Sequence, residues 1–560
     1  MRYKLLGDND YVFDPIGSVL SNRGIEDAEK YLNLNAKVCI PYSKLKSIDK
    51  AVCTTIKHIE NKSVIYIMVD PDVDGFTSAS ILYSYLKLVS PELEIIWDVH
   101  KGKEHGIANI TIPDNVNLVI VPDSGSNDFD KHKELYIKGI DVIILDHHEV
   151  EYESKHAIVI NSQISDYPNK NLSGAGIVYK FCKALDDELW LDYADYFLDL
   201  VALGNISDSM SMGEYETRYF VNKGLKNINN EFFLALFKQQ EYSTKGVASI
   251  TNVSFYITPL INATIRFGTI EDKVDMFKAF IGEKSLVKYK PRGSDEFVYE
   301  PFSTNMARRC YNLRSKQSRA CGKIVEGLSQ KVDLEILKGN KVVVLDARKE
   351  LEGSLLSGLI ANQIASKYKR PTVVFSSFKN NLLCGSARGY NKSELKDFKD
   401  IVLKTGLFDY AQGHANAYGL GLKEEYVDQA ITTLNMLLKD ITFEEVFEVD
   451  FSLKANSISE SLIYTIHEHS FIWGKGIEEP SFFISNLPVT KDNITLMGKN
   501  NDTVKINNNN IDFIFFKSSE DAYNQLLQEK EINVIGRASV NYFGKELHPR
   551  IIVDEYEFII

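Results

Sequence analysis

The chain has 560 residues. Because a single hydrophobic core does not organise a chain of this length, the sequence predicts three or four domains of about 100 to 200 residues each. Apolar residues make up 44% and charged residues 25%, as in globular proteins, and no apolar run approaches the roughly 18 residues of a membrane-spanning helix. The net charge of −13 argues mildly against a protein that coats duplex DNA, and six cysteines without paired spacing predict reduced thiols in a cytoplasm.

The first half of the chain is predicted to contain three segments. Residues 1–61 are expected to form a helical lead-in. Over residues 62–213, short β-branched runs alternate with helical patterns, which predicts a parallel α/β sheet with right-handed crossovers. Residues 214–330 have mostly helical patterns and are expected to form a connector that includes a long helix over 305–328.

The second half is predicted to contain two further domains. Residues 331–445 show a second α/β pattern. Residues 446–560 change to short alternating segments, which predict a small β-barrel with an OB-fold as the favoured topology. The expected fold class is therefore α/β, with a parallel-sheet domain, a helical connector, a second α/β domain and a C-terminal OB-like barrel.

Acidic and histidine side chains follow three of the predicted buried strands, at 64–69, 116–121 and 142–145. Because parallel strands end at the same edge of a sheet, these side chains are expected to gather there. Oxygen ligands with one or two imidazoles suit Mn²⁺ or Mg²⁺, whereas thiolates would have suggested structural zinc. The pattern predicts a two-metal phosphoester hydrolase, and its residues are Asp70, Asp72, Asp74, Asp123, Asp146, His147 and His148.

Two of these elements also have simpler interpretations. The spacing of Asp70, Asp72 and Asp74 would suit a Ca²⁺-binding loop or a solvated turn, but a strand precedes it and Ile81 stands where an EF-hand requires its closing Glu. Asp208 ends an apolar segment and, taken alone, would be a helix-end residue. The combination of elements favours the metal site.

Several motifs in one order resemble the DHH phosphoesterase superfamily, and specifically the bacterial RecJ single-strand exonucleases. In the predicted catalytic domain they are DxDxDG (70–75), PDSG (122–125), DHH (146–148), SGAG (173–176), LG (203–204) and the late acid Asp208. Elsewhere they are Arg23-Gly24-Ile25, PLINATIR (259–266), GSAR (385–388), GHANA (413–417) and FIWGKG (471–476). The chain departs from the family in its PDSG segment, where VDCG-like sequences are usual, and around 351–354, where a Trp-His segment is replaced.

The resemblance implies roles for individual residues. Two Mn²⁺ or Mg²⁺ ions are expected on Asp70, Asp72, Asp74, Asp123, His147 and Asp208. His148 is expected to contact the scissile phosphate or aid proton transfer, and Asp146 to orient an imidazole. Arg266, Ser386 and Arg388 are expected to bind the 5′-phosphate of single-stranded DNA, with His414 and Asn416 lining the same cleft; alternatively, Ser386 and Arg388 cap a helix or bridge lobes.

Further DNA contacts are expected on the connector and in the barrel. Four arginines of the connector form either part of a backbone track or a solvated face: Arg308, Arg309, Arg314 and Arg319. Tyr542 and Phe543 are expected to stack bases.

The expected function is a metal-dependent 5′→3′ exonuclease that hydrolyses single-stranded DNA to 5′-mononucleotides in DNA repair or recombination. We expect a cytoplasmic monomer without a membrane association, with a helicase or a single-strand-binding protein as partner. One alternative is a DHH phosphodiesterase acting on short oligoribonucleotides or cyclic dinucleotides. The other is a catalytically inactive RecJ-like scaffold of a replicative helicase, which the intact metal ligands disfavour.

Overall fold

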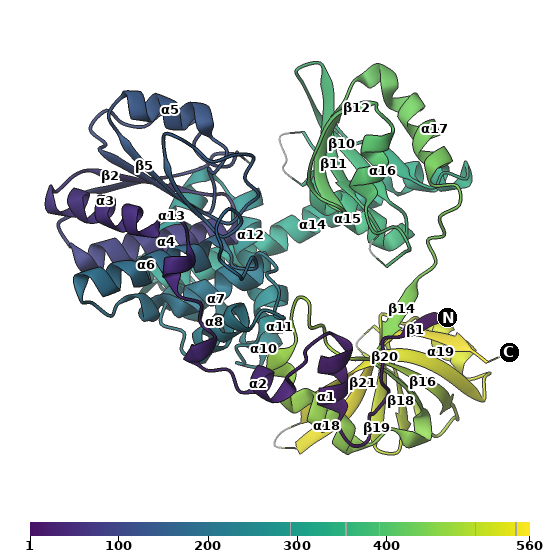
Figure 1. Cartoon of the computed structure of the whole chain (residues 1–560). Coiled ribbons are helices and arrows are strands. Elements are labelled where there is room, and N and C mark those ends of the chain that lie inside the picture. Colours follow the sequence, from purple (N-terminus) through teal and green to yellow (C-terminus); the bar gives the residue numbers. More distant parts are fainter. Residues whose placement is uncertain are drawn as a thin grey trace. The chain divides into compact units, whose positions relative to one another are not determined.

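The computed structural model (Figure 1) describes the chain except for residues 103, 292, 353–355, 391, 499, 544–545 and 560, and except for the side chains of residues 542 and 543. The predicted stacking side chains of Tyr542 and Phe543, and the departure at Gly353 and Ser354, therefore lie outside the described residues. The chain forms two compact units. The N-terminal unit comprises residues 23–314 and 469–479, and the C-terminal unit comprises residues 1–22, 315–468 and 480–560.

A parallel five-stranded sheet organises the N-terminal unit. Its order is β3-β2-β4-β5-β6, formed by β2 (Ile65–Val69), β3 (Ile95–Val99), β4 (Leu118–Pro122), β5 (Asp141–Asp146) and β6 (Ile158–Asn161). Strands β2 and β4 are buried along their whole length, as their β-branched sequences predict. Because the chain places β3 and β4 on opposite sides of β2, the strand order reverses between β2 and β4. Ligands bind at such a switch point, beyond the carboxyl ends of the strands.

Helices cover both faces of this sheet. Helix α5 packs on the face that presents Tyr66 and Met68, and α3, α4 and α6 lie on the opposite side (Figure 1). Further helices extend this second layer. The helices of the N-terminal unit are α2 (Ala28–Leu32), α3 (Ile48–Glu60), α4 (Val73–Val89), α5 (Phe129–Ile137), α6 (Gly174–Leu189), α7 (Leu198–Ser207), α8 (Tyr215–Lys226), α9 (Glu231–Gln239), α10 (Glu241–Thr244), α11 (Ile250–Asn252), α12 (Thr258–Phe267) and α13 (Ile270–Phe280), with a π-helical turn at Val253–Ile257.

The predicted helical connector contains an antiparallel hairpin that the sequence patterns did not indicate. Strands β7 (Leu286–Tyr289) and β8 (Val298–Pro301) form it, just before helix α14 (Phe302–Leu337). Helix α14 is longer than the predicted 305–328 and runs from one compact unit into the other.

The C-terminal unit contains the predicted second α/β domain. Its sheet has the order β12-β13-β11-β10-β9, with only β9 and β10 parallel among these strands. The strands are β9 (Val343–Asp346), β10 (Thr372–Lys379), β11 (Leu382–Arg388), β12 (Phe408–His414) and β13 (Ala417–Leu422), and the helices are α15 (Ser357–Tyr368), α16 (Phe398–Lys404) and α17 (Val427–Leu437).

A seven-stranded, mostly antiparallel sheet also belongs to this unit, as the alternating segments predict. Its order is β15-β16-β20-β21-β19-β18-β17. The elements are β15 (Phe451–Lys454), α18 (Glu460–Glu468), β16 (Ser481–Pro488), β17 (Ile494–Met497), β18 (Thr503–Asn508), β19 (Ile511–Phe516), α19 (Glu520–Leu526), β20 (Glu531–Phe543) and β21 (Glu546–Phe558).

The first 22 residues join the C-terminal unit instead of preceding the catalytic domain as a helical lead-in. Strand β1 (Arg2–Leu5) pairs in parallel with β14 (Val446–Val449), and helix α1 (Pro15–Asn22) packs near α18. The strand was not predicted, because four residues paired with a segment more than 400 positions away leave no local signal.

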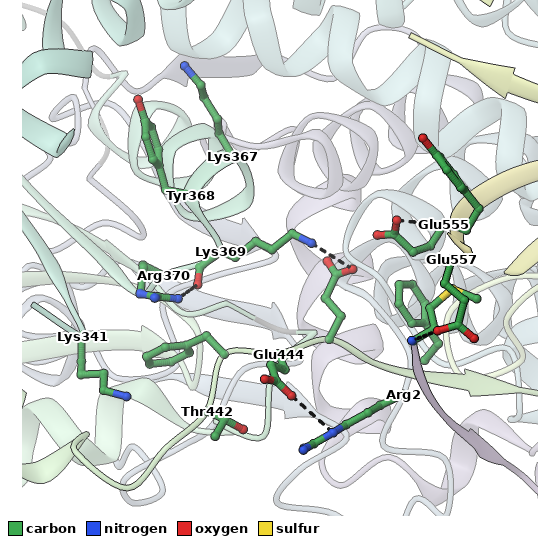
Figure 2. Close-up of a pocket in the computed structure, with 15 residues that line it drawn as sticks. Arg2, Lys341, Lys367, Tyr368, Lys369, Arg370, Thr442, Glu444, Glu555 and Glu557 are labelled. Atoms are coloured by element: carbon green, nitrogen blue, oxygen red, sulfur yellow. Dashed lines mark hydrogen bonds and ion pairs between the residues drawn. The ribbon is translucent and has the colours of Figure 1, made fainter. Parts of the chain in front are cut away.

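A cavity of about 1060 Å³ lies in the C-terminal unit (Figure 2). Ion pairs line it: Arg2 lies 3.3 Å from Glu444, and Lys369 lies 3.5 Å from Glu445. Its lining carries charges of both signs. Among the described residues, none of the helices has the length and apolarity needed to cross a membrane.

Candidate metal centre

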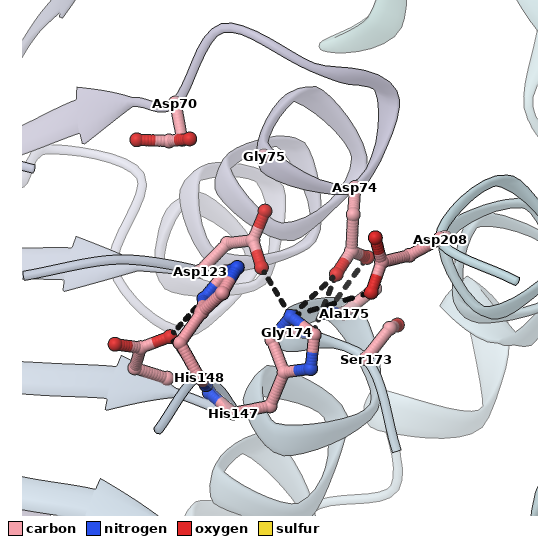
Figure 3. A network of polar contacts seen from close by, with 12 residues as sticks. Asp70, Asp74, Gly75, Asp123, His147, His148, Ser173, Gly174, Ala175 and Asp208 are labelled. Atoms are coloured by element: carbon pink, nitrogen blue, oxygen red, sulfur yellow. Dashed lines mark hydrogen bonds and ion pairs between the residues drawn. The ribbon is translucent and has the colours of Figure 1, made fainter. Parts of the chain in front are cut away.

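The carboxyl ends of β2, β4 and β5 bring acidic and imidazole side chains together at the switch point of the sheet (Figure 3). Asp70 directly follows β2, Asp123 follows β4 and His147 follows β5, and all three are buried. Asp74 lies in the first turn of α4 and is also buried, while Asp208 caps the end of α7 and is partly exposed.

His147 is the centre of this cluster. Its Nε2 atom lies 3.2 Å from Oδ1 of Asp123, 3.5 Å from Oδ2 of Asp208 and 3.8 Å from Oδ2 of Asp74. Asp70, Asp72 and Asp123 form an adjoining group in which one carboxylate oxygen of each residue lies within 4.8 Å of the other two. The six predicted metal ligands therefore lie together in one unit.

Helix α6 holds one of the carboxylates in place. The backbone N–H groups of Gly174 and Ala175 donate to Asp74, at 2.6 and 3.1 Å. These donors are at the N-terminus of α6, where the helix dipole favours a negative charge. The fixed Asp74 carboxylate thus keeps a defined position in an otherwise repulsive cluster.

Two glycines allow the chain to approach the carboxylates this closely. A Cβ atom on Gly174 would lie 2.4 Å from Oδ1 of Asp123, and one on Gly204 would lie 2.3 Å from Oδ1 of Asp74. Both distances are far below a van der Waals contact. The SGAG and LG motifs therefore have a steric role beside the metal ligands.

The cluster has the chemistry of a cation site. Both carboxylate oxygens of Asp123 and Nε2 of His147 are buried and have no hydrogen-bond partner among the described residues. Burial, together with the charges of Asp74 and Asp72, raises the pKa of Asp123 well above its usual value and that of Asp208 to about 8. Unpaired buried oxygen atoms and mutually repelling carboxylates fit divalent cations, which would neutralise them.

Asp146 and His148 form a hydrogen-bonded pair beside the cluster. Oδ1 of Asp146 accepts hydrogen bonds from Nδ1 of His148 at 2.8 Å and from the backbone N–H of His147 at 2.7 Å. Burial raises the pKa of the Asp146 carboxyl, but its bonds to His148 outweigh this and lower it overall. Burial lowers the pKa of His148, but Asp146 outweighs this and raises it to about 9. Asp146 therefore orients the half-exposed His148 imidazole.

His105 is a residue of the site that the sequence patterns did not predict. Its Nδ1 atom lies 2.6 Å from Oδ2 of Asp70, and the backbone N–H of Gly106 donates to the other oxygen of Asp70 at 3.1 Å. His105 comes from the loop between β3 and β4. A single histidine in a polar loop gives no signal in a sequence, whereas the strand-end acids do.

The predicted substrate residues are divided between the two units. Arg266 is exposed near the end of α12 in the N-terminal unit, where the charge of Asp72 acts on its guanidinium. In the C-terminal unit, Arg388 of β11 and His414 of β12 both pair with Ala417 of β13, from opposite sides. Buried Ser386 lies two residues before Arg388, and its Oγ lies 2.9 Å from Oγ of Ser357.

Asn416 has a structural role in this region. Its side-chain oxygen accepts a hydrogen bond from the N–H of Phe398, and its amide nitrogen donates to the carbonyl of Lys396. The amide group therefore fixes the loop before α16. A role in lining the substrate cleft stays a prediction.

Two of the four connector arginines are held by internal ion pairs. Arg308 is bound to Glu300, and Arg309 contacts Asp272 and Asp275 at 2.5 and 2.7 Å. These contacts anchor helix α14 to the elements before it. They favour neither a DNA track nor a simple solvated face for these two residues.

Comparisons with known proteins agree with this architecture. The model of the DHH family N-terminal domain matches residues 63–205, and the model of the RecJ OB domain matches residues 449–555. The YorK protein of the SPbeta prophage in Bacillus subtilis (strain 168), provisionally named a single-strand DNA-specific exonuclease, is 42% identical over the whole of this chain and 98% of its own length.

Two more distant proteins are similar to this chain over nearly its whole length. The single-stranded-DNA-specific exonuclease RecJ of Bacillus subtilis (strain 168) is 25% identical over 99% of this chain and 69% of its own. The crystal structure of RecJ from Thermus thermophilus in complex with Mn²⁺ has a TM-score of 0.75 at 18% identity, covering 98% of this chain and 76% of that one. The predicted resemblance and fold class are thereby confirmed. The chain belongs to the DHH phosphoesterases, in the RecJ-like family of single-strand DNA-specific exonucleases.

Proposed function

We propose that this protein is a metal-dependent exonuclease that hydrolyses single-stranded DNA from the 5′ end and releases 5′-mononucleotides. The observation that carries the proposal is the buried cluster at the switch point, in which Asp123 and Nε2 of His147 have no other hydrogen-bond partners among the described residues. The exonuclease names of the relatives support the same reaction.

The acidic cluster would hold two divalent cations, Mn²⁺ or Mg²⁺. Its oxygen atoms suit either ion, and the RecJ structures of Thermus thermophilus contain one or the other. When bound, such ions activate water for attack and neutralise charge that develops on the phosphate. The ligands would be the predicted set, Asp70, Asp72, Asp74, Asp123, His147 and Asp208.

The protein's own groups would position the substrate around this cluster. Asp146 holds Nδ1 of His148, which leaves the Nε2 side of the half-exposed ring for a phosphate oxygen of the substrate. The backbone donors on Asp74 keep that ligand rigid while DNA binds.

Recognition of a chain end would determine the direction of hydrolysis. A guanidinium group binds a terminal phosphate through paired N–H groups, and a serine hydroxyl adds a further donor. We assign this role to Arg266 in the N-terminal unit and to Ser386, Arg388 and His414 in the C-terminal unit.

The family resemblance leads to three further predictions. They are a function in DNA repair or recombination, a monomeric state in the cytoplasm, and a helicase or single-strand-binding protein as partner.

The test compares single-stranded oligonucleotides labelled at the 5′ or the 3′ end, with and without Mn²⁺. We expect early release of the 5′ label as a mononucleotide, dependence on Mn²⁺ or Mg²⁺, and no cleavage of circular single strands. The variants Asp146→Ala and His147→Ala should abolish hydrolysis. Early release of the 3′ label would contradict the direction, and activity confined to short oligoribonucleotides or cyclic dinucleotides would contradict the substrate.

A further inference from the structure

The β7–β8 hairpin of the N-terminal unit presents two different faces. Lys288 pairs with Tyr299 across the strands, and Tyr289 pairs with Val298. Since side chains alternate along a strand, Leu286 and Lys288 share a face with Tyr299. Along β7 and the residue after it the exposure alternates accordingly, with Leu286, Lys288 and Lys290 exposed and the residues between them half-buried.

One face anchors the hairpin to helix α14. The guanidinium group of Arg308 lies 3.4 Å from the ring centre of Tyr289, and its Nη1 donates to Glu300 at 2.8 Å. Asn305 donates to the same carboxylate at 2.8 Å. These partly buried contacts fix the hairpin on the first two turns of α14, so that its other face has a defined orientation.

The other face exposes aromatic rings and lysine side chains to solvent. Phe297 is 56% exposed and Tyr299 is 68% exposed. Lysine ammonium groups lie over the Phe297 ring, Nζ of Lys288 at 4.4 Å and Nζ of Lys290 at 6.0 Å. Lys290 also lies 3.6 Å from Asp295, so the positive charge of this face comes mainly from Lys288.

We propose that this face, formed by Lys288, Lys290, Phe297 and Tyr299, is a platform on which bases of single-stranded DNA stack. This inference rests on the proposed function, because it names the contact that the nuclease makes with its substrate. Exposed rings accept the faces of unpaired bases whatever their sequence, and the ammonium groups are placed to meet the phosphates beside them. Duplex DNA does not fit, because its bases are already stacked on one another.

The test measures equilibrium binding by fluorescence anisotropy with the full chain in EDTA, so that hydrolysis does not interfere. The probes are labelled oligothymidylate and an abasic strand of the same length. Phe297→Ala and Tyr299→Ala should each weaken oligothymidylate binding about tenfold and leave abasic binding unchanged, because only bases stack. The matched control is Trp190→Ala, which removes a 93% exposed ring beside acidic residues and should have no effect.

Lys288→Gln should lower the slope of log affinity against log salt by about 0.7, as expected for one lost phosphate contact on a single strand. Unchanged oligothymidylate affinity in the aromatic variants would overturn the platform. An equal loss on the abasic strand would also overturn it, because the contact would then not be to bases. The outcome is independent of catalysis: a binding loss in a protein without nuclease activity would refute the proposed function and leave the platform standing.

Discussion

At Gly204, helix α7 passes so close to Asp74 that the site has no room for a side chain. The nearest atoms to an added Cβ are Oδ1 of Asp74 at 2.3 Å, Cβ of Ala175 at 2.6 Å and Oγ1 of Thr77 at 2.9 Å. The ligand and the N-terminus of α6 would both have to move. The geometry of the metal centre thus depends on a residue that takes no part in the chemistry.

We therefore predict that Gly204→Ala reduces nuclease activity by about 100-fold, the order of loss that a displacement near 1 Å produces in an active site. The measurement is the initial rate on a 5′-labelled single strand with Mn²⁺. The control is Gly322→Ala in α14, another helical glycine, which has open space around it. That variant should keep full activity and gain about 1 kcal/mol of stability; equal losses in both variants would contradict the steric argument.

His105 provides a second prediction at this scale. His105→Ala removes the side-chain donor to Asp70 and should lower kcat by about 10- to 100-fold, the equivalent of a hydrogen bond to a charged group. His105→Asn should restore most of the activity, because the Asn amide nitrogen occupies nearly the position of Nδ1. His548→Ala, at another half-exposed histidine beside an acid, should have no effect. Failure of Asn to rescue Ala would show that His105 does more than position Asp70.

The site residues that the sequence predicted differ from those it missed in how clearly the neighbouring residues indicate their position. Asp70, Asp123 and His147 follow apolar strands, so the position of each side chain follows from the sheet. His105 comes from a loop whose path is determined by tertiary contacts, and the steric role of Gly174 and Gly204 depends on packing between elements. None of these is encoded in a short window of sequence.

At the scale of elements, helix α5 contains a histidine side chain that is fully buried. His132 has no exposed surface, and its Nδ1 lies 3.1 Å from Oγ of Ser154. Burial lowers the pKa of His132 to about 4. The folded protein therefore keeps this imidazole neutral at pH values where an unfolded chain would protonate it.

The sign of the effect follows from the protons bound in each state. Between pH 6.5 and about 4 the unfolded chain binds a proton at His132 that the folded chain does not, so the free energy of unfolding falls as the pH falls. We predict that the contribution of His132 falls by about 2 kcal/mol between pH 7 and pH 5. The measurement is urea unfolding of the wild type and of His132→Gln at both pH values. An equal pH dependence in the two proteins would contradict the prediction.

The strands of the hairpin and strand β1 were not predicted from the sequence, because they are short. The two strands of the hairpin, β7 and β8, have four residues each, and only β7 alternates in exposure. Strand β1 is equally short. The buried strands β2, β4 and β5 consist of uninterrupted apolar runs, so the sequence predicted them.

At the scale of the whole molecule, the three tryptophans of the chain all belong to the N-terminal unit. Trp97 and Trp190 lie in residues 23–314, and Trp473 lies in the segment 469–479 that joins the same unit. Tryptophan fluorescence therefore reports on the unit that contains the metal centre and not on the C-terminal unit.

We predict that Mn²⁺ raises the melting temperature seen by tryptophan fluorescence by a few degrees. At a concentration 100 times the Kd, a bound ion stabilises the folded state by about 2.7 kcal/mol. Calorimetry should show a second transition, from the C-terminal unit, that Mn²⁺ leaves in place. Asp123→Asn should abolish the shift, and an equal shift of both transitions would contradict a metal centre confined to the N-terminal unit.

The pairing of β1 with β14 affects the order in which contacts form during synthesis of the chain. Arg2 aligns with Val446, so one strand of this pair is synthesised 444 residues before the other. At about 5 to 20 residues per second, a ribosome takes roughly 20 to 90 s to cover that distance. During this time β1 lacks its partner strand while the parallel sheet of residues 65–161 is synthesised, so this small pairing forms only after the strands of that sheet have been made.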